Sequence, residues 1–363
     1  MNKSRREFLG KSFAALGAVA LAPSLLSSCS GNKDASAASA ADGAAASGNP
    51  SSVFNGVAIG TITYSWRSMP GGLENIVKYC HETGISTIEL MSNDLESYLG
   101  APESPMMRIM QEARKNQPQQ PAGGAPGGAP GPMRRPSFTP EQQAEIDKYN
   151  ADVKAWRINI DMDKVAQAKK LLDDNGIEAH IVKFSPSSWS DEEIDYAFNV
   201  AKAMGAKAVS EEVGMEMAQK LAPFAEKHDM YVVCHQHMQF ADPDFDYDKI
   251  LAVSPRIMMN FDSGHFFGST GRNPIEIIEK YHDRIFSIHI KDKTGPNTQP
   301  TPNTNQVWGQ GEMPLEEVLT YIKDKKYPIY CDIELEYEVK PWSNAVKEVR
   351  TCVNYAKRIL LLP

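Results

Sequence analysis

Eight short strand-like runs alternate with eight helical patterns between residues 57 and 361, and this alternation restricts the possible folds more than any other feature. Apolar runs predict strands over 57–66, 86–92, 178–184, 206–214, 230–238, 256–265, 284–292 and 327–337. The patterns after them predict helices over 71–83, 161–175, 190–204, 215–228, 246–253, 273–281, 314–325 and 343–361. Repeated strand–helix units form a parallel sheet, and eight units close into a (β/α)8 barrel. We therefore predict the α/β class and a single TIM barrel as the catalytic domain over residues 53–363.

A long insertion follows the second predicted strand, over residues 101–160. It contains the Pro/Gly-rich stretch "NQPQQPAGGAPGGAPGPMRRP" (116–136), whose composition cannot build a hydrophobic core. The flanking segments 104–115 and 139–158 predict exposed polar helices. Loops after barrel strands lie on the catalytic face, so the insertion is either disordered or a lid over the active site.

The first 29 residues have the pattern of an export signal, with a basic start, an apolar middle and small residues at the end. "SRREFL" (4–9) resembles a twin-arginine signal, and "LSSC" (26–29) resembles a bacterial lipobox. We expect an exported lipoprotein of a Gram-negative bacterium, periplasmic or outer-membrane-anchored, that meets the membrane only through a lipid on Cys29. An ordinary cleaved signal is the alternative. Residues 30–52 are rich in alanine, serine and glycine and predict a flexible tether.

Charge and cysteine usage exclude some partners and sites. The formal charge is −8, and the body of the chain has no basic cluster, which argues against a nucleic-acid partner. The four cysteines after Cys29 show no CxxC spacing, which argues against a zinc–thiolate site. Cys80 and Cys352 fall in predicted helices and could pair in an oxidising periplasm, or remain free. The sequence also allows a homo-oligomer.

Polar residues gather at the ends of the last four predicted strands. Alternate residues of a barrel strand point inward, and the carboxyl ends of the strands form the active site. The residues that this rule turns inward are His235, His237, Asp262, His289, Lys291, Glu334 and Glu336, and His265 follows Asp262 by three positions. Carboxylates and imidazoles that converge in one buried place need a cation between them. We therefore expect one divalent metal ion, and mixed ligands of this kind favour Mn, Zn, Co or Fe over Ca.

Further residues are candidates for contacts with a substrate. They are Glu89, Trp66, Trp308, His237 and Glu336. Glu89 ends the second predicted strand, and the two tryptophans could stack on a sugar ring or simply pack in the core. The inward phase of the fourth strand is open, so either Glu211 or Glu212 points into the barrel.

The chain resembles the xylose isomerase-like TIM barrels, a superfamily that includes sugar isomerases and epimerases, inosose isomerases and dehydratases, and endonuclease IV. The stretches that carry the resemblance are "CHQH" (234–237), "FDSGH" (261–265), "IHIKD" (288–292), "VWGQGEMPL" (307–315) and "DIELE" (332–336). The resemblance implies a metal held by Asp262, His289 and Glu334. His235 stands where the family has a glutamate, and we expect it to be the fourth ligand, with His237 as the alternative.

The resemblance also implies a small carbohydrate substrate. We expect an exported metal-dependent isomerase or epimerase that acts on a free sugar, polyol or glycoside through a metal-stabilised enediolate. The expected catalytic residues are Glu334, which removes a proton next to a carbonyl, Lys291 and His265. Epimerases of the family use two metal-bound carboxylates, so His235 raises the alternative of a keto-sugar lyase or dehydratase, on a 3-keto-glycoside or an inosose-like ketone. A non-catalytic carbohydrate-binding lipoprotein is the second alternative.

Overall fold

Eight parallel strands form a closed barrel in the computed structural model, which describes residues 48–115 and 138–362. The strands are β2 (Val57–Ile62), β3 (Thr87–Met91), β4 (Glu178–Lys183), β5 (Ala208–Glu212), β6 (Tyr231–His235), β7 (Ile257–Asp262), β8 (Ile285–Ile290) and β11 (Tyr330–Ile333). Each pairs in parallel with its neighbours, and β2 pairs with both β3 and β11, which closes the ring. All eight lie within the predicted strand segments, so the predicted (β/α)8 barrel is confirmed.

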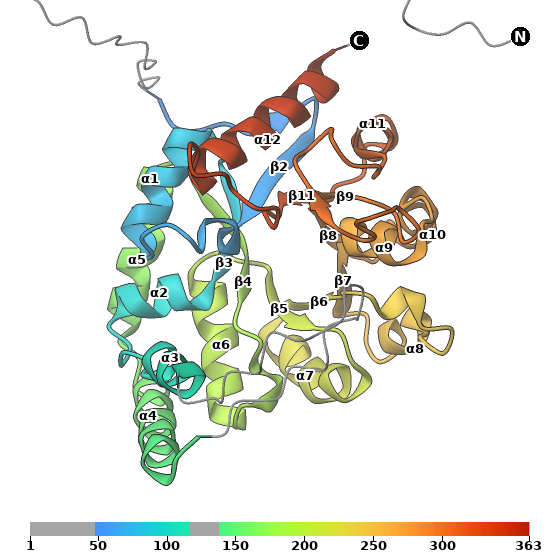
Figure 1. Cartoon of the computed structure of the whole chain (residues 1–363). Helices are drawn as coiled ribbons and strands as arrows, with labels where there is room; N and C mark the ends of the chain where they lie inside the picture. Colours follow the sequence, from blue (N-terminus) through green and yellow to red (C-terminus); the bar gives the residue numbers. More distant parts are fainter. Residues whose placement is uncertain (1–47, 116–137, 363) are drawn as a thin grey trace, which may run out of the picture. The chain divides into compact units, whose positions relative to one another are not determined.

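Helices surround the barrel (Figure 1). Eight of them belong to the predicted strand–helix units. They are α1 (Leu73–Thr83), α5 (Met162–Asp174), α6 (Asp191–Ala203), α7 (Met215–His228), α8 (Tyr247–Leu251), α10 (Ile275–Tyr281), α11 (Leu315–Lys325) and α12 (Ala345–Leu361). Each buries one apolar face against the strands. On α12 the buried positions recur at helical spacing, at Val346, Val349, Val353, Ala356 and Leu360.

Successive residues of β6 pack on opposite sides of the sheet. On β6, Val232 and Cys234 belong to the large hydrophobic core between the strands and the helices. Val233 packs instead with Ile181 and Phe286 in a small second cluster on the other side of the sheet, inside the barrel. This alternation turns the next odd-numbered residue of β6, His235, toward the barrel interior.

Shorter elements complete the fold. They are β1 (Val53–Phe54), η1 (Thr63–Trp66), α2 (Ser92–Leu99), α3 (Met106–Lys115), α4 (Pro140–Ile158), η2 (Pro186–Ser188), η3 (Gln239–Ala241), α9 (Ser263–Thr270), β9 (Asp292–Lys293) and β10 (Asn305–Gln306). The last two strands pair as an antiparallel ribbon directly after β8. Helix α9 and this ribbon were not predicted, and both add residues to the carboxyl-terminal mouth of the barrel.

Helices α3 and α4 occupy the two insertion segments for which polar helices are predicted, and they lie side by side (Figure 1). Arg108 forms an ion pair with Glu145 across them. The last turn of α4 packs on α6, where Trp156 meets Tyr196 with ring centroids 5.9 Å apart. The whole Pro/Gly-rich stretch lies outside the described residues, so its role as a lid or a disordered segment stays a prediction.

The predicted export signal, including Cys29, lies outside the described residues and stays a prediction. Within the described part of the chain, no helix is long and apolar enough to cross a membrane. Cys80, Cys234, Cys331 and Cys352 are all buried free thiols, so the disulfide considered for Cys80 and Cys352 is not formed.

Candidate active site

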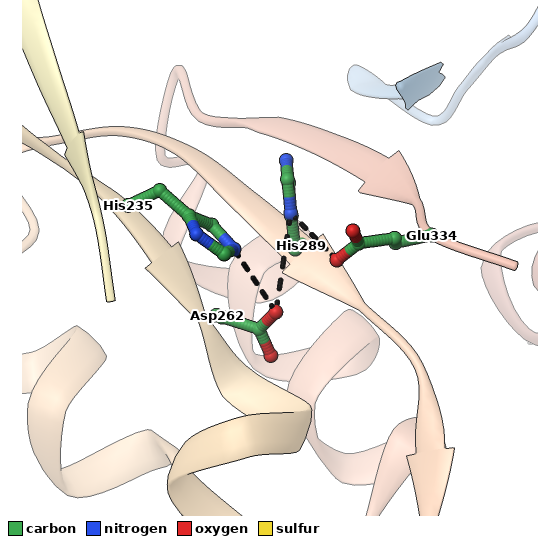
Figure 2. Close-up of side chains that lie close together, drawn as sticks. All are labelled: His235, Asp262, His289 and Glu334. Atoms are coloured by element: carbon green, nitrogen blue, oxygen red, sulfur yellow. Dashed lines mark hydrogen bonds and ion pairs between the residues drawn. The ribbon is translucent and has the colours of Figure 1, made fainter. Parts of the chain in front are cut away.

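His235, Asp262, His289 and Glu334 converge at the carboxyl-terminal mouth of the barrel, from the ends of β6, β7, β8 and β11 (Figure 2). One ligand atom from each of the four lies within 4.8 Å of all the others. Asp262 Oδ2 is 3.3 Å from His235 Nε2 and 3.9 Å from His289 Nδ1. The sequence analysis predicts this same set of four ligands.

Asp262 is fixed by its place between a strand and a helix. It ends β7 and caps the first turn of α9, where its Oδ1 accepts a 2.7 Å hydrogen bond from the backbone N–H of His265. The Gln236 side chain bonds to both the N–H and the carbonyl of Asp262, at 3.0 and 2.7 Å. These contacts use Oδ1 and the backbone, so Oδ2 is left to face the other polar side chains of the mouth.

His289 is held between two carboxylates. Its Nδ1 is 2.9 Å from Glu334 Oε2, and its Nε2 is 2.8 Å from Glu89 Oε2. Burial alone would lower the pKa of His289, but Glu334 and Glu89 together raise it well above its usual value. Asn260 also donates to Glu89, at 2.9 Å. Glu89 therefore orients the imidazole and leaves Nδ1 directed at the centre of the site.

Lys291 places a buried ammonium among three carboxylates. Its Nζ is 2.8 Å from Asp262 Oδ2, 2.6 Å from Glu334 Oε2 and 2.7 Å from Glu336 Oε2. Burial would lower the pKa of Lys291, but the three carboxylates raise it above its usual value, so the amine is a cation. Asp292 does not pair with it, because its Oδ2 accepts the backbone N–H groups of Gly309 and Gly311 at the base of the following loop.

A second group of imidazoles and carboxylates lies beside the first. Glu212 Oε2 is 3.3 Å from His235 Nδ1 and 3.1 Å from His237 Nε2, and Glu212 Oε1 is 2.9 Å from Lys183 Nζ. Glu212 is therefore the β5 residue that points into the barrel. Glu211 instead accepts a hydrogen bond from the backbone N–H of Ser187. Sequence analysis missed Lys183, although it shares its inward phase with Ile181 two residues earlier on β4.

His265 lies on α9 at the edge of the site. Its Nε2 is 3.8 Å from both Asp262 Oδ2 and Glu336 Oε2. Burial lowers the pKa of His265 to about 4, and the attraction of Asp262 only partly offsets this, so the ring is neutral near pH 7. The ring of His237 has its centroid 4.9 Å away, and this side chain is 53% exposed at the rim.

The two tryptophans considered as sugar platforms lie in the hydrophobic core. Trp66 packs on Tyr79 with ring centroids 5.5 Å apart, and Trp308 packs edge-on against Tyr355 at 5.9 Å. Both side chains are buried. This packing supports the structural interpretation of each tryptophan and gives no support to a stacking contact with substrate.

The donor set fits a divalent metal ion. Two imidazole nitrogens and two carboxylate oxygens within 4.8 Å of one another match the spacing of ligands around one transition-metal ion. Glu89 supplies the outer carboxylate that orients a histidine ligand. Lys291 contacts the same oxygens of Asp262 and Glu334, so an ion at this position would share them with the ammonium.

Comparison with protein families and curated sequences gives one consistent group. The family described as "Xylose isomerase-like TIM barrel" matches residues 144–355. An inosose dehydratase of Clostridium botulinum is 27% identical over 146 residues, which cover 35% of this chain and 49% of that protein. An inosose dehydratase of Clostridium beijerinckii is 38% identical over 76 residues, 20% of this chain and 25% of that protein. The matched regions thus span half or less of these relatives.

Solved structures share the fold at low sequence identity. A probable 3-DHS dehydratase of Bacillus anthracis has a TM-score of 0.51 at 14% identity and covers 82% of this chain and 97% of its own. The IOLI protein, whose structure holds a zinc atom, has a TM-score of 0.51 at 14% identity and covers 84% of this chain and 98% of its own.

Proposed function

The chain belongs to the xylose isomerase-like TIM barrel family, and from this premise we propose that it is a metal-dependent dehydratase of a neutral keto-sugar or keto-polyol. Similarity to inosose dehydratases over part of the chain supports a cyclic polyhydroxylated ketone as the substrate class. The reaction we propose removes a proton from the carbon next to the carbonyl and expels a hydroxyl group from the carbon beyond it. The products are an unsaturated ketone and water.

The metal in this proposal is held by His235, Asp262, His289 and Glu334. When bound, a divalent ion supplies Lewis-acid polarisation of a carbonyl oxygen. Mixed imidazole and carboxylate ligands favour Mn, Zn, Co or Fe.

Glu334 and Lys291 supply the base and a fixed positive charge for the first step. The Glu334 carboxylate accepts the proton from the carbon next to the carbonyl. The negative charge then moves to the carbonyl oxygen, where the nearby Lys291 ammonium stabilises it without reorganisation, because its three carboxylate partners already hold it in place. A base and a positive charge near the carbonyl oxygen are the two groups that formation of an enolate requires.

The observation that favours elimination over epimerisation is His235 at the end of β6. Epimerisation by two carboxylates needs one on each face of the substrate, and the β6 position offers an imidazole. Glu212, the neighbouring carboxylate, is engaged by Lys183, His235 and His237. The imidazole of His237 faces the mouth from this side. Its hydrogen bond to Glu212 raises its pKa, so His237 can pass a proton to a departing hydroxyl, whereas the neutral ring of His265 can only hydrogen-bond to it.

Isomerisation is the second candidate function. It begins with the same proton removal and needs only one base, which returns the proton to the neighbouring carbon. Glu334, whose Oε2 is shared by Lys291 and His289, could serve both carbons of a small ketose. The isomerase activity expected from the sequence therefore remains a distinct outcome of the test below.

The test uses the purified chain loaded with Mn or Zn and 2-keto-myo-inositol, a 3-keto-glycoside and a free ketose as substrates in D₂O. Elimination is expected to give a product lighter by one water and a new enone absorbance. Deuterium incorporation or a changed sugar without loss of water would identify an isomerase or epimerase. Binding without either reaction would favour a carbohydrate-binding protein and overturn both enzymatic proposals.

We also propose that the enzyme acts outside the cytoplasm as a lipoprotein. The basis is the sequence of residues 1–29 alone, with the lipobox at Cys29. In cells, wild-type protein is expected in the membrane fraction with incorporated fatty acid, and Cys29→Ser is expected to lose both. Membrane association and lipid labelling that are unchanged in Cys29→Ser would contradict the proposal.

A further inference from the structure

A buried lysine without a hydrogen-bond partner lies next to the proposed catalytic centre. Lys293, on β9, is 3% exposed and lies two residues beyond Lys291. Across the described ranges 48–115 and 138–362, its Nζ makes neither a hydrogen bond nor an ion pair. Burial and the nearby Lys291 ammonium lower the pKa of Lys293. The side chain of Lys293 is thus covered almost to its end while Nζ itself stays accessible, so the amine can bond to a ligand in the site.

Three buried polar atoms without a partner belong to residues near this lysine. His265 Nδ1, Asn303 Oδ1 and Asn305 Oδ1 are buried, and none has a partner among the described residues. Asn305 faces Lys293 directly in the β9–β10 ribbon. The charge of Lys293 also acts on the imidazole of His265. We call these four residues the Lys293 subsite.

Gly268 of α9 lets Asn303 and Lys293 pack directly against the helix. A Cβ atom at Gly268 would lie 2.2 Å from Asn303 Oδ1 and 2.8 Å from Lys293 Cε, closer than real Cβ contacts come. Asn303 Oδ1 and Lys293 Cε therefore lie on the same side of α9, next to Gly268. His265 precedes Gly268 by three residues and lies on the same face of the helix. The four residues of the subsite thus lie together beside α9.

The mixture of donors and acceptors identifies the ligand class. The ammonium of Lys293 only donates, the two amide oxygens only accept, and the His265 nitrogen completes the set. A phosphate or carboxylate would bring acceptor oxygens against the amide oxygens and against Glu336, which lies 3.5 Å from the Asn305 amide nitrogen. A hydroxyl group both donates and accepts. We propose that the Lys293 subsite binds two neighbouring hydroxyl groups of a neutral polyol or keto-sugar.

This subsite deepens the proposed function and rests on it, because it binds the part of the substrate that does not react. Unpaired buried polar groups discriminate strongly against ligands that lack matching hydroxyls. The subsite would therefore select polyhydroxylated ketones over deoxygenated or phosphorylated ones.

The test measures binding by calorimetry to the intact metal-loaded chain, with 2-keto-myo-inositol, myo-inositol and inorganic phosphate as probes. Lys293→Met removes the ammonium at nearly constant volume, and Asn303→Ser removes one amide oxygen while Lys293 stays. Lys249→Met, at an exposed lysine on α8, is the matched control. Metal content and thermal midpoint are recorded for each variant, and the midpoint of Lys293→Met is expected to be no lower than that of wild type.

The expected result is binding of the two polyols, weakened about tenfold or more by Lys293→Met and by a smaller factor in Asn303→Ser, with metal content unchanged. Equal polyol affinity in Lys293→Met and wild type would overturn the proposal. So would tight phosphate binding that Lys293→Met abolishes, or no binding of either polyol by wild type. Polyol binding without turnover would contradict only the proposed reaction.

Discussion

The Nζ atom of Lys291 lies 2.6 Å from Oε2 of Glu334, and neither side chain is more than 7% exposed. The same glutamate oxygen is 2.9 Å from Nδ1 of His289. One carboxylate oxygen is therefore shared by an ammonium, an imidazole and the predicted metal position. This sharing links the charge balance of the site, its metal affinity and its proposed base.

Removal of the Lys291 charge should destabilise the metal-free chain. Lys291→Met leaves three carboxylates close together, and we expect the free energy of unfolding to fall by about 3–5 kcal/mol, as when one partner of a buried ion pair is lost. Added Mn or Zn should restore most of the loss by replacing the positive charge. Urea unfolding with chelator and with metal measures both. A metal-free variant as stable as wild type would show that Lys291 does not balance these carboxylates.

Replacement of the proposed base should stop the first chemical step. We expect Glu334→Gln to lower proton exchange and turnover by about 10²- to 10⁴-fold, the usual contribution of a general base. Glu338→Gln is the control, because Glu338 is 79% exposed and pairs with Lys340 on the surface. Exchange with solvent deuterium, followed by NMR, reports the step directly. Comparable exchange in both variants would remove Glu334 from the mechanism.

Glu89 should affect metal affinity without being a ligand. Its Oε2 holds Nε2 of His289 at 2.8 Å, and loss of such an outer carboxylate typically weakens metal binding by about 10- to 100-fold. We therefore expect Glu89→Gln to weaken binding in this range in a competition titration with a chromophoric chelator. Glu178→Gln, at the opposite end of a neighbouring strand, should bind metal like wild type. Unchanged affinity in Glu89→Gln would contradict the orienting role.

Asp94, at the start of α2, gives a pH prediction that is independent of the metal site. Burial raises the pKa of Asp94 above 3.8, although hydrogen bonds from Gly72 and Thr63 oppose the shift. The folded state therefore keeps its proton to higher pH than the unfolded state, so stability falls as pH rises from 3.8 through the raised pKa. Asp94→Asn should remove this part of the loss in urea titrations over that range. Parallel pH profiles of the two proteins would contradict the assignment.

Local patterns in the sequence predict most of the fold. The eight strands and eight surrounding helices follow from apolar periodicity, and alternation along β6 correctly turns Val232 and Cys234 outward and His235 inward. Helix α9 and the β9–β10 ribbon were missed because both are short and begin immediately after a strand.

The features of the site that the sequence did not predict depend on contacts between residues far apart in the chain. The bond between Glu89 and His289 joins residues 200 positions apart, and it depends on how the closed barrel brings β3 opposite β8. Lys183 and Lys293 share their phase with inward residues two positions earlier, so strand alternation was a usable signal for both. The burial of Trp66 and Trp308 depends on helices packed over them, which their local sequence does not reveal.

Metal content of the purified chain tests the central claim most directly. Asp262→Asn keeps the oxygen that caps α9 and removes the charge from the predicted ligand, while Asp324→Asn changes an exposed residue on α11. After incubation with Mn, Zn, Co or Fe, we predict about one ion per chain in wild type and Asp324→Asn, from the four-ligand spacing of a single site, and loss of the ion in Asp262→Asn. No metal in wild type, or equal metal in Asp262→Asn, would contradict the account.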